Sequence, residues 1–300
     1  MELWIPLTIA AAFFQNIRSA MQKHLQGRMS TLAAAYVRFI YAVPIALIYL
    51  SGVLIYSDSS IPETSTRFWF FCLLGGLCQI AFTVLLLWLF SFRNFAVGTT
   101  FSKLETIMVA IFGLLLLGDK LTGTVALAIA LSTLGLWILS ATQLKLTPAS
   151  LLSGLWNKPT LIGLACAASL GASVVFFRGA SLLLNLDNFL LSAAFTLFIV
   201  LGLQSLIMGA WMLFRDRDNL IKVFIHWRPA LAVGLSGGLT SIGWFTAFTL
   251  QNATYVRALG QIELLFSFLA TVFIFREKIT RAELVGICFI TTSIILVLLG

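Results

Sequence analysis

Apolar runs of about 20 residues dominate the chain, and short polar or turn-rich segments separate them. A helix needs about 20 mostly apolar residues to cross about 30 Å of hydrocarbon. In hydrocarbon every backbone N–H and C=O group must be bonded within its own segment, so such runs are expected to be helices. The alternating segments of a barrel are absent. The predicted fold class is an all-α membrane protein, with ten runs at approximately 3–22, 31–51, 68–91, 95–117, 123–143, 159–181, 188–214, 229–250, 256–275 and 282–299.

The composition agrees with helices whose outer surface faces lipid. Hydrophobic residues make up 60% of the 300 positions and charged residues 10%, whereas ordinary soluble domains carry roughly 25% charged residues. A cytosolic globular enzyme is therefore excluded. The longest connections between the runs, at 52–67, 144–158 and 215–228, are too short to fold as separate domains. The activity is therefore expected to reside within the bilayer.

The charged residues and cysteines give no sign of nucleic-acid binding or enzyme chemistry. The formal net charge of +8 comes from short basic clusters between apolar runs, which are typical of loops at a membrane surface. The sequence has no nucleophile triad, no Walker phosphate loop and no metal-ligand spacing. We therefore expect no enzyme activity, no catalytic residue, no cofactor, no metal and no nucleic-acid partner. The four cysteines lie inside apolar runs and are expected to be small core residues: Cys72, Cys78, Cys166 and Cys288.

The chain reads as two copies of a five-helix unit, with expected boundaries of 1–145 and 158–300. A shift of 158 residues aligns polar residues of the two copies in the same order and without a gap. An odd number of helices per copy means that the second copy enters the membrane from the opposite side, which makes a 5+5 inverted repeat. Such repeats are typical of alternating-access transporters. The aligned pairs are Asn94 and Asn252, Glu105 and Glu263, Asp119 and Glu277, Lys120 and Lys278, and Thr122 and Thr280.

A second shared pattern lies in the fourth predicted helix of each copy. An aliphatic residue and a glutamate precede an apolar run, which ends in an acidic residue and a Leu-Thr or Ile-Thr step. In this pattern the chain resembles the drug/metabolite transporter superfamily, specifically its ten-helix EamA-type permeases, with Thr106 and Leu264 in place of the family's proline. The resemblance implies a cavity between helices 1 to 4 and 6 to 9, with helices 5 and 10 joining the halves. The pattern occupies Leu104–Thr106, Gly118–Asp119 and Leu121–Thr122, and then Ile262–Leu264, Arg276–Glu277 and Ile279–Thr280.

Two glutamates lie deep inside predicted helices. An ionisable group at mid-bilayer costs roughly 2.5–3.5 kcal/mol on insertion scales, so it is retained mainly where it faces a cavity or a partner. Burial disfavours the charged carboxylate, which makes Glu105 and Glu263 candidates for substrate binding and for proton coupling. A neighbouring arginine or lysine would keep either carboxylate ionised instead. A purely structural role in bonding the two copies together is the alternative.

A polar seam interrupts the first apolar run. Gln15, Ser19 and Gln22 fall on one face at helical spacing, and Arg18 lies one turn from the two glutamines. This seam is expected to line the cavity near its mouth, with a frayed helix end as the alternative. In the second run, Arg38 could clamp a substrate carboxylate in bidentate fashion or pair with one of the two glutamates.

Further polar and aromatic residues complete the expected cavity. Gln79 and Gln261 are amides within apolar runs, where they have no reason to face lipid. Trp88 and Trp244 are candidates for stacking on a substrate, although tryptophans in membrane proteins are often interfacial anchors.

The expected function is transport of a small polar metabolite by alternating access, either secondary active or facilitative. Export of an amino acid or a related compound fits best, because both signs of charge lie on the expected path. Efflux of lipophilic organic cations is the first alternative, in which the glutamates and aromatics would suffice. A membrane scaffold subunit without transport is the alternative from another class.

The location follows from the spans, and the orientation from the basic residues. We expect a monomeric multi-pass protein of a bacterial cytoplasmic (inner) membrane whose partners are the lipid bilayer and a small-molecule metabolite. The loops after odd-numbered spans hold most of the Lys and Arg residues. The positive-inside rule therefore places both termini outside the cytoplasm, whereas the family resemblance implies that they lie inside.

Overall fold

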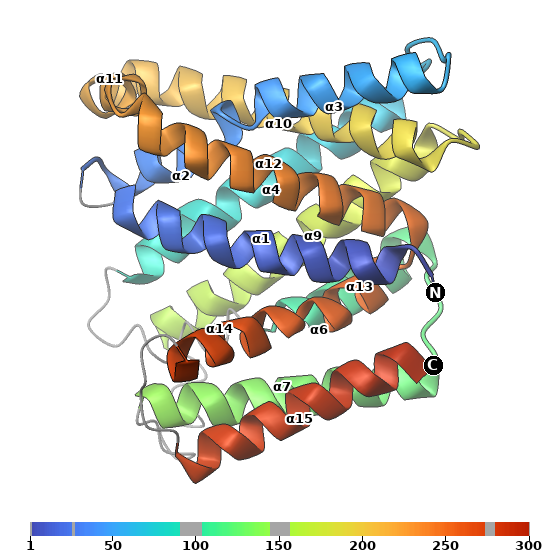
Figure 1. Ribbon diagram of the computed structural model, residues 1–300, viewed down its shortest axis with the longest axis vertical. Helices are drawn as coiled ribbons and strands as arrows, with labels where there is room; N and C mark the ends of the chain where they lie inside the picture. The colour runs from blue at the N-terminus through green and yellow to red at the C-terminus, as the bar shows by residue number, and fades with distance from the viewer. Residues whose placement is uncertain (1, 26–27, 91–103, 145–156, 274–279, 300) are drawn as a thin grey trace. The chain divides into compact units, whose positions relative to one another are not determined.

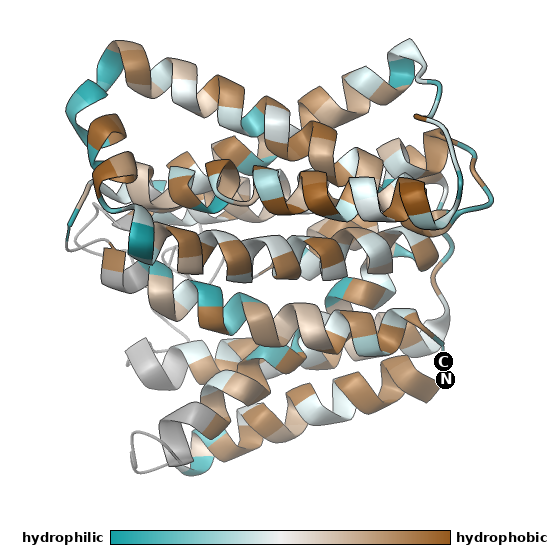
Figure 2. Cartoon of the chain, turned by 45° about the horizontal axis from the view of Figure 1, so that its top comes forward, coloured by the Kyte–Doolittle hydropathy of each residue, from teal (hydrophilic) through white to brown (hydrophobic). Residues whose placement is uncertain are grey.

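The computed structural model describes residues 2–25, 28–90, 104–144, 157–273 and 280–299, and every regular element in these ranges is a helix (Figure 1). The predicted all-α class is confirmed for this part of the chain. Brown hydrophobic positions predominate along the helices in Figure 2, and teal hydrophilic positions gather mostly at helix ends and in connecting loops. This distribution is that of helices surrounded by lipid.

Seven helices in the described ranges are long and apolar enough to cross a membrane. The helix α1 (Trp4–Leu25) is long enough to cross a membrane, but the polar seam lowers its hydropathy. The predicted span that begins at residue 95 lies partly outside the described residues. The predicted run at 256–275 is divided between α13 (Ala253–Gly260) and α14 (Ile262–Phe273). The seven spans are Thr31–Tyr56, Thr66–Leu86, Gly123–Ser140, Lys158–Leu183, Phe189–Arg215, Trp227–Leu250 and Arg281–Leu299.

The described residues fall into two compact units, and each unit contains segments from both halves of the sequence. Unit 1 comprises residues 1–80 and 176–251, and unit 2 comprises 81–175 and 252–300. The helices α4 (Thr66–Phe90) and α9 (Lys158–Leu183) contribute residues to both units. The two compact units therefore do not coincide with the two sequence copies.

Unit 1 packs around α10 (Phe189–Arg215), which contacts α2 (Thr31–Ile40), α3 (Val43–Tyr56) and α12 (Trp227–Leu250). The core is apolar and includes the stacked rings of Phe177 and Phe245, whose centroids are 5.0 Å apart. The helix α1 packs along α12, and the short helix α11 (Arg217–Ile225) connects α10 to α12. This packing brings the polar seam of α1 against α12.

The second membrane span is broken in its middle. Pro44 lies in the first turn of α3 and has no backbone N–H to donate. Just before it, the backbone N–H of Ala42 donates to the carbonyl of Phe39, three residues earlier, at 3.0 Å, whereas an α-helix would pair it with the residue four positions earlier. The helix α12 approaches this break closely, because a Cβ added to Gly234 would lie 2.8 Å from the backbone carbon of Tyr41. The break lies three residues after Arg38, which is in the last turn of α2.

The close approach at Gly234 gives a stability prediction. Gly234→Ala is expected to lower the melting temperature of the purified protein, because the added methyl group must displace the Tyr41 backbone, and overpacking costs about 1–3 kcal/mol. Gly202→Ala on α10 is the matched control, because nothing lies within 4 Å of its Cβ position. Equal melting temperatures for the two variants would contradict the close packing.

Unit 2 contains a tight pair of helices, α7 (Gly123–Leu144) and α15 (Arg281–Leu299), which approach at two glycines. A Cβ on Gly135 would lie 2.7 Å from the carbonyl oxygen of Gly286, so the backbones are in direct contact. The helix α13 packs against α6 (Glu105–Phe112), which continues into the π-helical turn η1 (Gly113–Leu117). The expectation that the cysteines are core residues holds for Cys72 and Cys166. Cys78 is half-buried, and the expectation is wrong for Cys288, which is exposed on α15.

Candidate functional site

In unit 1, the polar seam of α1 meets α12 through a glutamine and a tryptophan. The indole Nε1 of Trp244 donates a hydrogen bond of 2.9 Å to Oε1 of Gln15. The Trp244 ring is stacked on Phe248 with centroids 5.6 Å apart. These contacts hold the plane of the indole, and they satisfy its only donor within the protein.

Two arginines of unit 1 lie close to each other. Arg18 on α1 and Arg38 on α2 are near enough to interact electrostatically. Gly237 on α12 makes room for this approach, since a Cβ there would lie 3.4 Å from Cδ of Arg18 and 3.6 Å from the carbonyl oxygen of Arg38. The guanidinium carbon of Arg38 lies 4.4 Å from the centre of the Phe39 ring. The arrangement concentrates positive charge beside the break in the second span.

Arg38 has no acidic partner among the residues that the structure describes. The sequence left open whether this arginine pairs with Glu105 or Glu263 or binds a substrate carboxylate. Arg38 belongs to unit 1 and both glutamates to unit 2, so these pairings stay predictions; within unit 2, Glu105 is bonded to another arginine. A partly buried guanidinium next to a second cation attracts an anion.

The remaining predicted residues of unit 1 differ in their contacts. Gln22 donates from Nε2 to the carbonyl of Ala34 at 2.8 Å and so ties α1 to α2. Ser19 is exposed and its hydroxyl bonds back to the carbonyl of Gln15. Gln79 on α4 accepts a bond of 2.6 Å from Nε2 of Gln204, a fully buried residue of α10.

In unit 2, an ion pair occupies the predicted position of the first deep glutamate. Nη2 of Arg257 on α13 donates to Oε1 of Glu105 on α6, and both side chains are nearly buried, at 9% and 12% exposure. Arg257 also interacts electrostatically with Glu263. The ion pair matches the alternative in which a neighbouring cation pairs with Glu105, and proton coupling at this residue stays a prediction.

A second polar contact supports the same helix pair. Gln261 donates from Nε2 to Oγ1 of Thr106 at 2.9 Å, and both residues are buried. Gln261 itself occupies the interruption between α13 and α14, where its N–H bonds to the carbonyl of Ala258. The span is therefore interrupted here even though the chain lacks the family's proline. Trp88 on α4 is 54% exposed, and its predicted stacking role stays a prediction.

Glu105 and Glu263 occupy equivalent local positions in their helices. Each lies in the first turn of its element, Glu105 in α6 and Glu263 in α14. This agreement extends the sequence repeat to local structure. Three of the aligned residues lie outside the described ranges: Asn94, Glu277 and Lys278.

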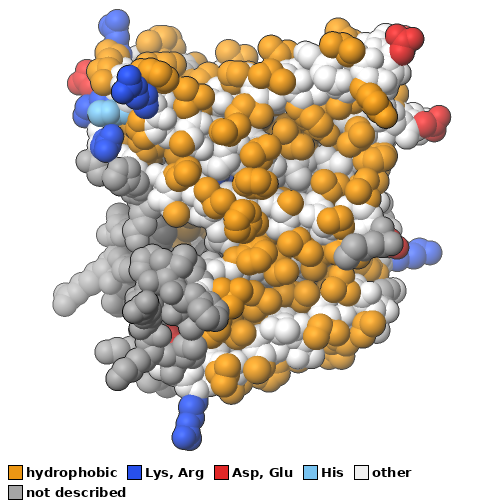
Figure 3. Space-filling view, viewed as in Figure 1, with side chains coloured by type: hydrophobic (Ala, Val, Ile, Leu, Met, Phe, Trp, Pro, Cys, Tyr) orange, Lys and Arg blue, Asp and Glu red, His pale blue; other side chains and the backbone are white. Residues whose placement is uncertain are grey.

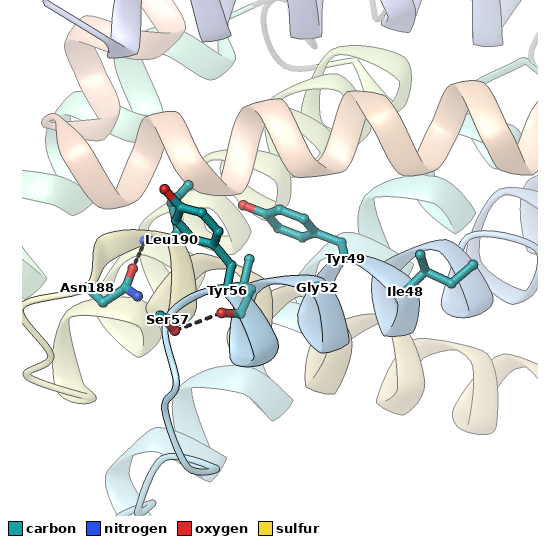
Figure 4. Close-up of a pocket in the computed structure, with 8 residues that line it drawn as sticks. Ile48, Tyr49, Gly52, Tyr56, Ser57, Asn188 and Leu190 are labelled. Carbon is teal, nitrogen blue, oxygen red and sulfur yellow. Dashed lines mark hydrogen bonds between the residues drawn. The ribbon is translucent and has the colours of Figure 1, made fainter.

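A cavity of about 320 Å³ opens in unit 1 where α3 ends and α10 begins (Figure 4). Its walls include Ile48, Tyr49, Gly52 and Tyr56, and the hydroxyl of Tyr49 lies 3.4 Å from that of Thr246. No charged residue lines it. The cavity is thus suited to an apolar group and lies apart from Arg18 and Arg38, since neither of them lines it.

The sequence did not single out Gln204, which the structure connects to the predicted Gln79. The sequence does place Arg257 among the polar residues of the ninth apolar run, but it does not identify this arginine as the partner of Glu105. Gln204 stands alone in the apolar run of α10. An isolated amide in such a run needs a hydrogen-bond partner on a neighbouring helix in hydrocarbon. This requirement could have identified Gln204 as a residue of the polar interior.

Buried polar and charged groups on long apolar helices define a multi-pass integral membrane protein. No curated protein matches the chain by sequence. The model of the EamA-like transporter family matches residues 2–141 and 158–299. The chain therefore belongs to the EamA-like transporter family, a transporter family of the drug/metabolite transporter type and not an enzyme family.

The solved structures support the fold independently. The 28 chains that match include one from a crystal structure of a protein whose function its description does not state. That chain is 13% identical with a TM-score of 0.72, and the alignment covers 99% of this chain and 96% of the other. At this identity the likeness is one of fold.

Proposed function

We propose that the protein is an alternating-access exporter of a small metabolite that carries a carboxylate, namely an amino acid or a related compound. It would work with ten membrane helices arranged as two inverted five-helix repeats, at 1–145 and 158–300, in a bacterial cytoplasmic membrane. Membership of a transporter family supports the class of activity. The substrate class is argued below from the charged residues.

The observation that carries the substrate class is the environment of Arg38. Its guanidinium lies within a membrane span beside Arg18, and no described acid neutralises it. A guanidinium binds a carboxylate through two parallel N–H···O bonds, which match the geometry of both groups. An amino acid also contains an ammonium group, and the chain contains acidic residues within its predicted spans in Glu105 and Glu263.

The inverted repeat is supported by the pairs of aligned residues and by the equivalent places of Glu105 and Glu263. Two copies of one unit threaded in opposite directions can exchange conformations, which is the basis of alternating access. The breaks at Tyr41–Ala42 and Gln261 add discontinuous helices, which recur at the sites of such transporters.

A thermal-shift screen tests the substrate class directly. A ligand present at 100 times its Kd stabilises the folded protein by about 2.7 kcal/mol. We expect one or more amino acids to raise the melting temperature of the purified protein. The corresponding amino-acid amides, which lack the carboxylate, are expected to have no effect.

The same screen separates the competing function. Stabilisation by lipophilic cations such as tetraphenylphosphonium, with no response to any carboxylate, would contradict the proposal and support efflux of organic cations. Equal stabilisation by an amino acid and its amide would show that Arg38 does not bind the substrate carboxylate.

A further inference from the structure

The helix α11 crosses the ends of α10 and α12. In Figure 1 it is seen nearly end-on, whereas α10 and α12 run across the view. Because α10 and α12 are membrane spans, this direction places α11 roughly parallel to the membrane surface.

The structure holds α11 firmly to unit 1. The Val223 side chain is buried, and the carbonyl of Val223 accepts a hydrogen bond of 3.1 Å from the Tyr41 hydroxyl. At the start of the helix, Ser30 donates from its N–H to Asn219 at 3.0 Å and from its hydroxyl to Asp216 at 3.2 Å. The segment is therefore a docked element with one defined outer face.

The outer face of α11 is apolar. Ile221, Phe224 and Ile225 follow helical spacing and are 48%, 54% and 65% exposed. Trp227, which begins the next helix, is 51% exposed. An apolar stripe on a short helix that lies along the membrane surface can bury itself at the boundary between headgroups and acyl chains.

Basic side chains flank this stripe. Figure 3 shows Lys and Arg side chains gathered at the end of unit 1 where α11 lies. Asp216, one of two acidic residues in the segment 215–228, is already bonded to Ser30 and Asn219. The exposed cations of this segment are Arg215, Arg217, Lys222 and Arg228.

The opposite end of unit 1 has the reverse character. Asp58, Glu63 and Asp187 are exposed there, together with the cation Arg67. Unit 1 is thus polarised along its spans, with a basic end at α11 and an acidic end at the C-terminus of α3. Charge complementarity therefore selects an anionic partner for the α11 end.

We infer that α11 is an interfacial helix that binds anionic phospholipid. Ile221, Phe224 and Ile225 insert among the upper acyl chains, while Arg217, Lys222 and Arg228 meet the phosphate groups. Juxtamembrane basic residues mark the cytoplasmic leaflet. The α11 end of unit 1 accordingly faces the cytoplasm, and the start of α1 at Trp4 faces the other side.

Lipid retention tests the binding. The full-length protein is purified with phosphatidylglycerol and phosphatidylcholine in equal amounts, and native mass spectrometry counts the retained lipids. We expect phosphatidylglycerol to be preferred by the unmodified protein and the preference to fall about tenfold or more in the variant R217Q/K222Q/R228Q. The control R67Q removes a cation at the opposite end and is expected to keep the preference.

The other outcomes are equally definite. Folding of each variant is checked by its melting temperature in phosphatidylcholine alone, and K222Q replaces the triple variant if the latter does not fold. No preference for phosphatidylglycerol in the unmodified protein, or an undiminished preference in the α11 variants, overturns the inference. Stabilisation by inorganic phosphate equal to that by phosphatidylglycerol would assign the cations to a soluble anion and overturn it as well.

Cysteine labelling tests the side of the membrane. Asp218→Cys is made in a background whose four native cysteines are alanine. A membrane-impermeant maleimide is expected to label it only after the cells are opened. Labelling in intact cells would place α11 outside and contradict the inference.

Discussion

Replacing Arg38 by glutamine is expected to weaken substrate binding by about 10- to 150-fold. The change removes hydrogen bonds between a charged donor and the substrate carboxylate, which are worth roughly 1.5–3 kcal/mol. Glutamine retains a polar side chain but cannot supply the charge or the paired donors of a guanidinium. Flux of the amino acid identified by thermal shift, measured in proteoliposomes over a range of concentrations, gives the KM of each variant.

Two matched variants accompany this measurement. Arg18→Gln removes the neighbouring cation and is expected to weaken flux less, because Arg38 still binds the carboxylate. Arg67→Gln, in the first turn of α4 and exposed, is expected to leave flux unchanged. Normal KM and flux in Arg38→Gln, with normal amounts of protein in the membrane, would contradict the proposal that Arg38 binds the substrate carboxylate.

The second large effect concerns stability. Arg257→Gln is expected to destabilise the protein by about 3–5 kcal/mol, because the carboxylate of Glu105 loses its ion-pair partner while remaining nearly buried. Glu105→Gln is expected to cost less, since Arg257 keeps its interaction with Glu263. The melting temperatures of the purified variants check this order.

The double variant provides the control for the ion pair. Glu105→Gln combined with Arg257→Gln removes both members, so it is expected to be more stable than Arg257→Gln alone. A double variant that is destabilised by the sum of the two single changes would show that the residues act independently.

The class of fold could be predicted from the sequence because the bilayer imposes it locally. A run such as 188–214 has only one way to bond its backbone in hydrocarbon, and the structure forms a helix over Phe189–Arg215. The pattern around Glu105 and Glu263 likewise identified the family, since it depends on residues close together in the chain. Neither inference required knowledge of distant contacts.

The pairing of side chains could not be predicted in the same way. Gln15 and Trp244 are 229 positions apart, and Arg257 and Glu105 are 152 apart. Helical spacing tells which face a residue occupies but not which distant helix lies opposite that face. For that reason the sequence left Arg38 and Glu105 as candidate partners of each other.

The helix breaks show a similar division. Pro44 made an interruption near the middle of the second span foreseeable in principle, since proline removes a backbone donor. The interruption at Gln261 has no proline, and it arises from a shift in backbone hydrogen bonding between Gln261 and Ala258. Such a shift depends on tertiary packing; Gly260, the last residue of α13, weakens the helix locally but does not by itself fix the position of the interruption.

The most direct test of transport itself is counterflow. Proteoliposomes loaded with an unlabelled amino acid at high concentration are diluted into a trace of the same labelled compound. The proposed exporter accumulates label transiently above equilibrium, and Arg38→Gln lowers the initial rate. The contrary result is that no compound from a broad panel of carboxylates, amines and lipophilic cations exchanges faster than in protein-free vesicles. The protein would then transport none of them, and a scaffold role would replace transport.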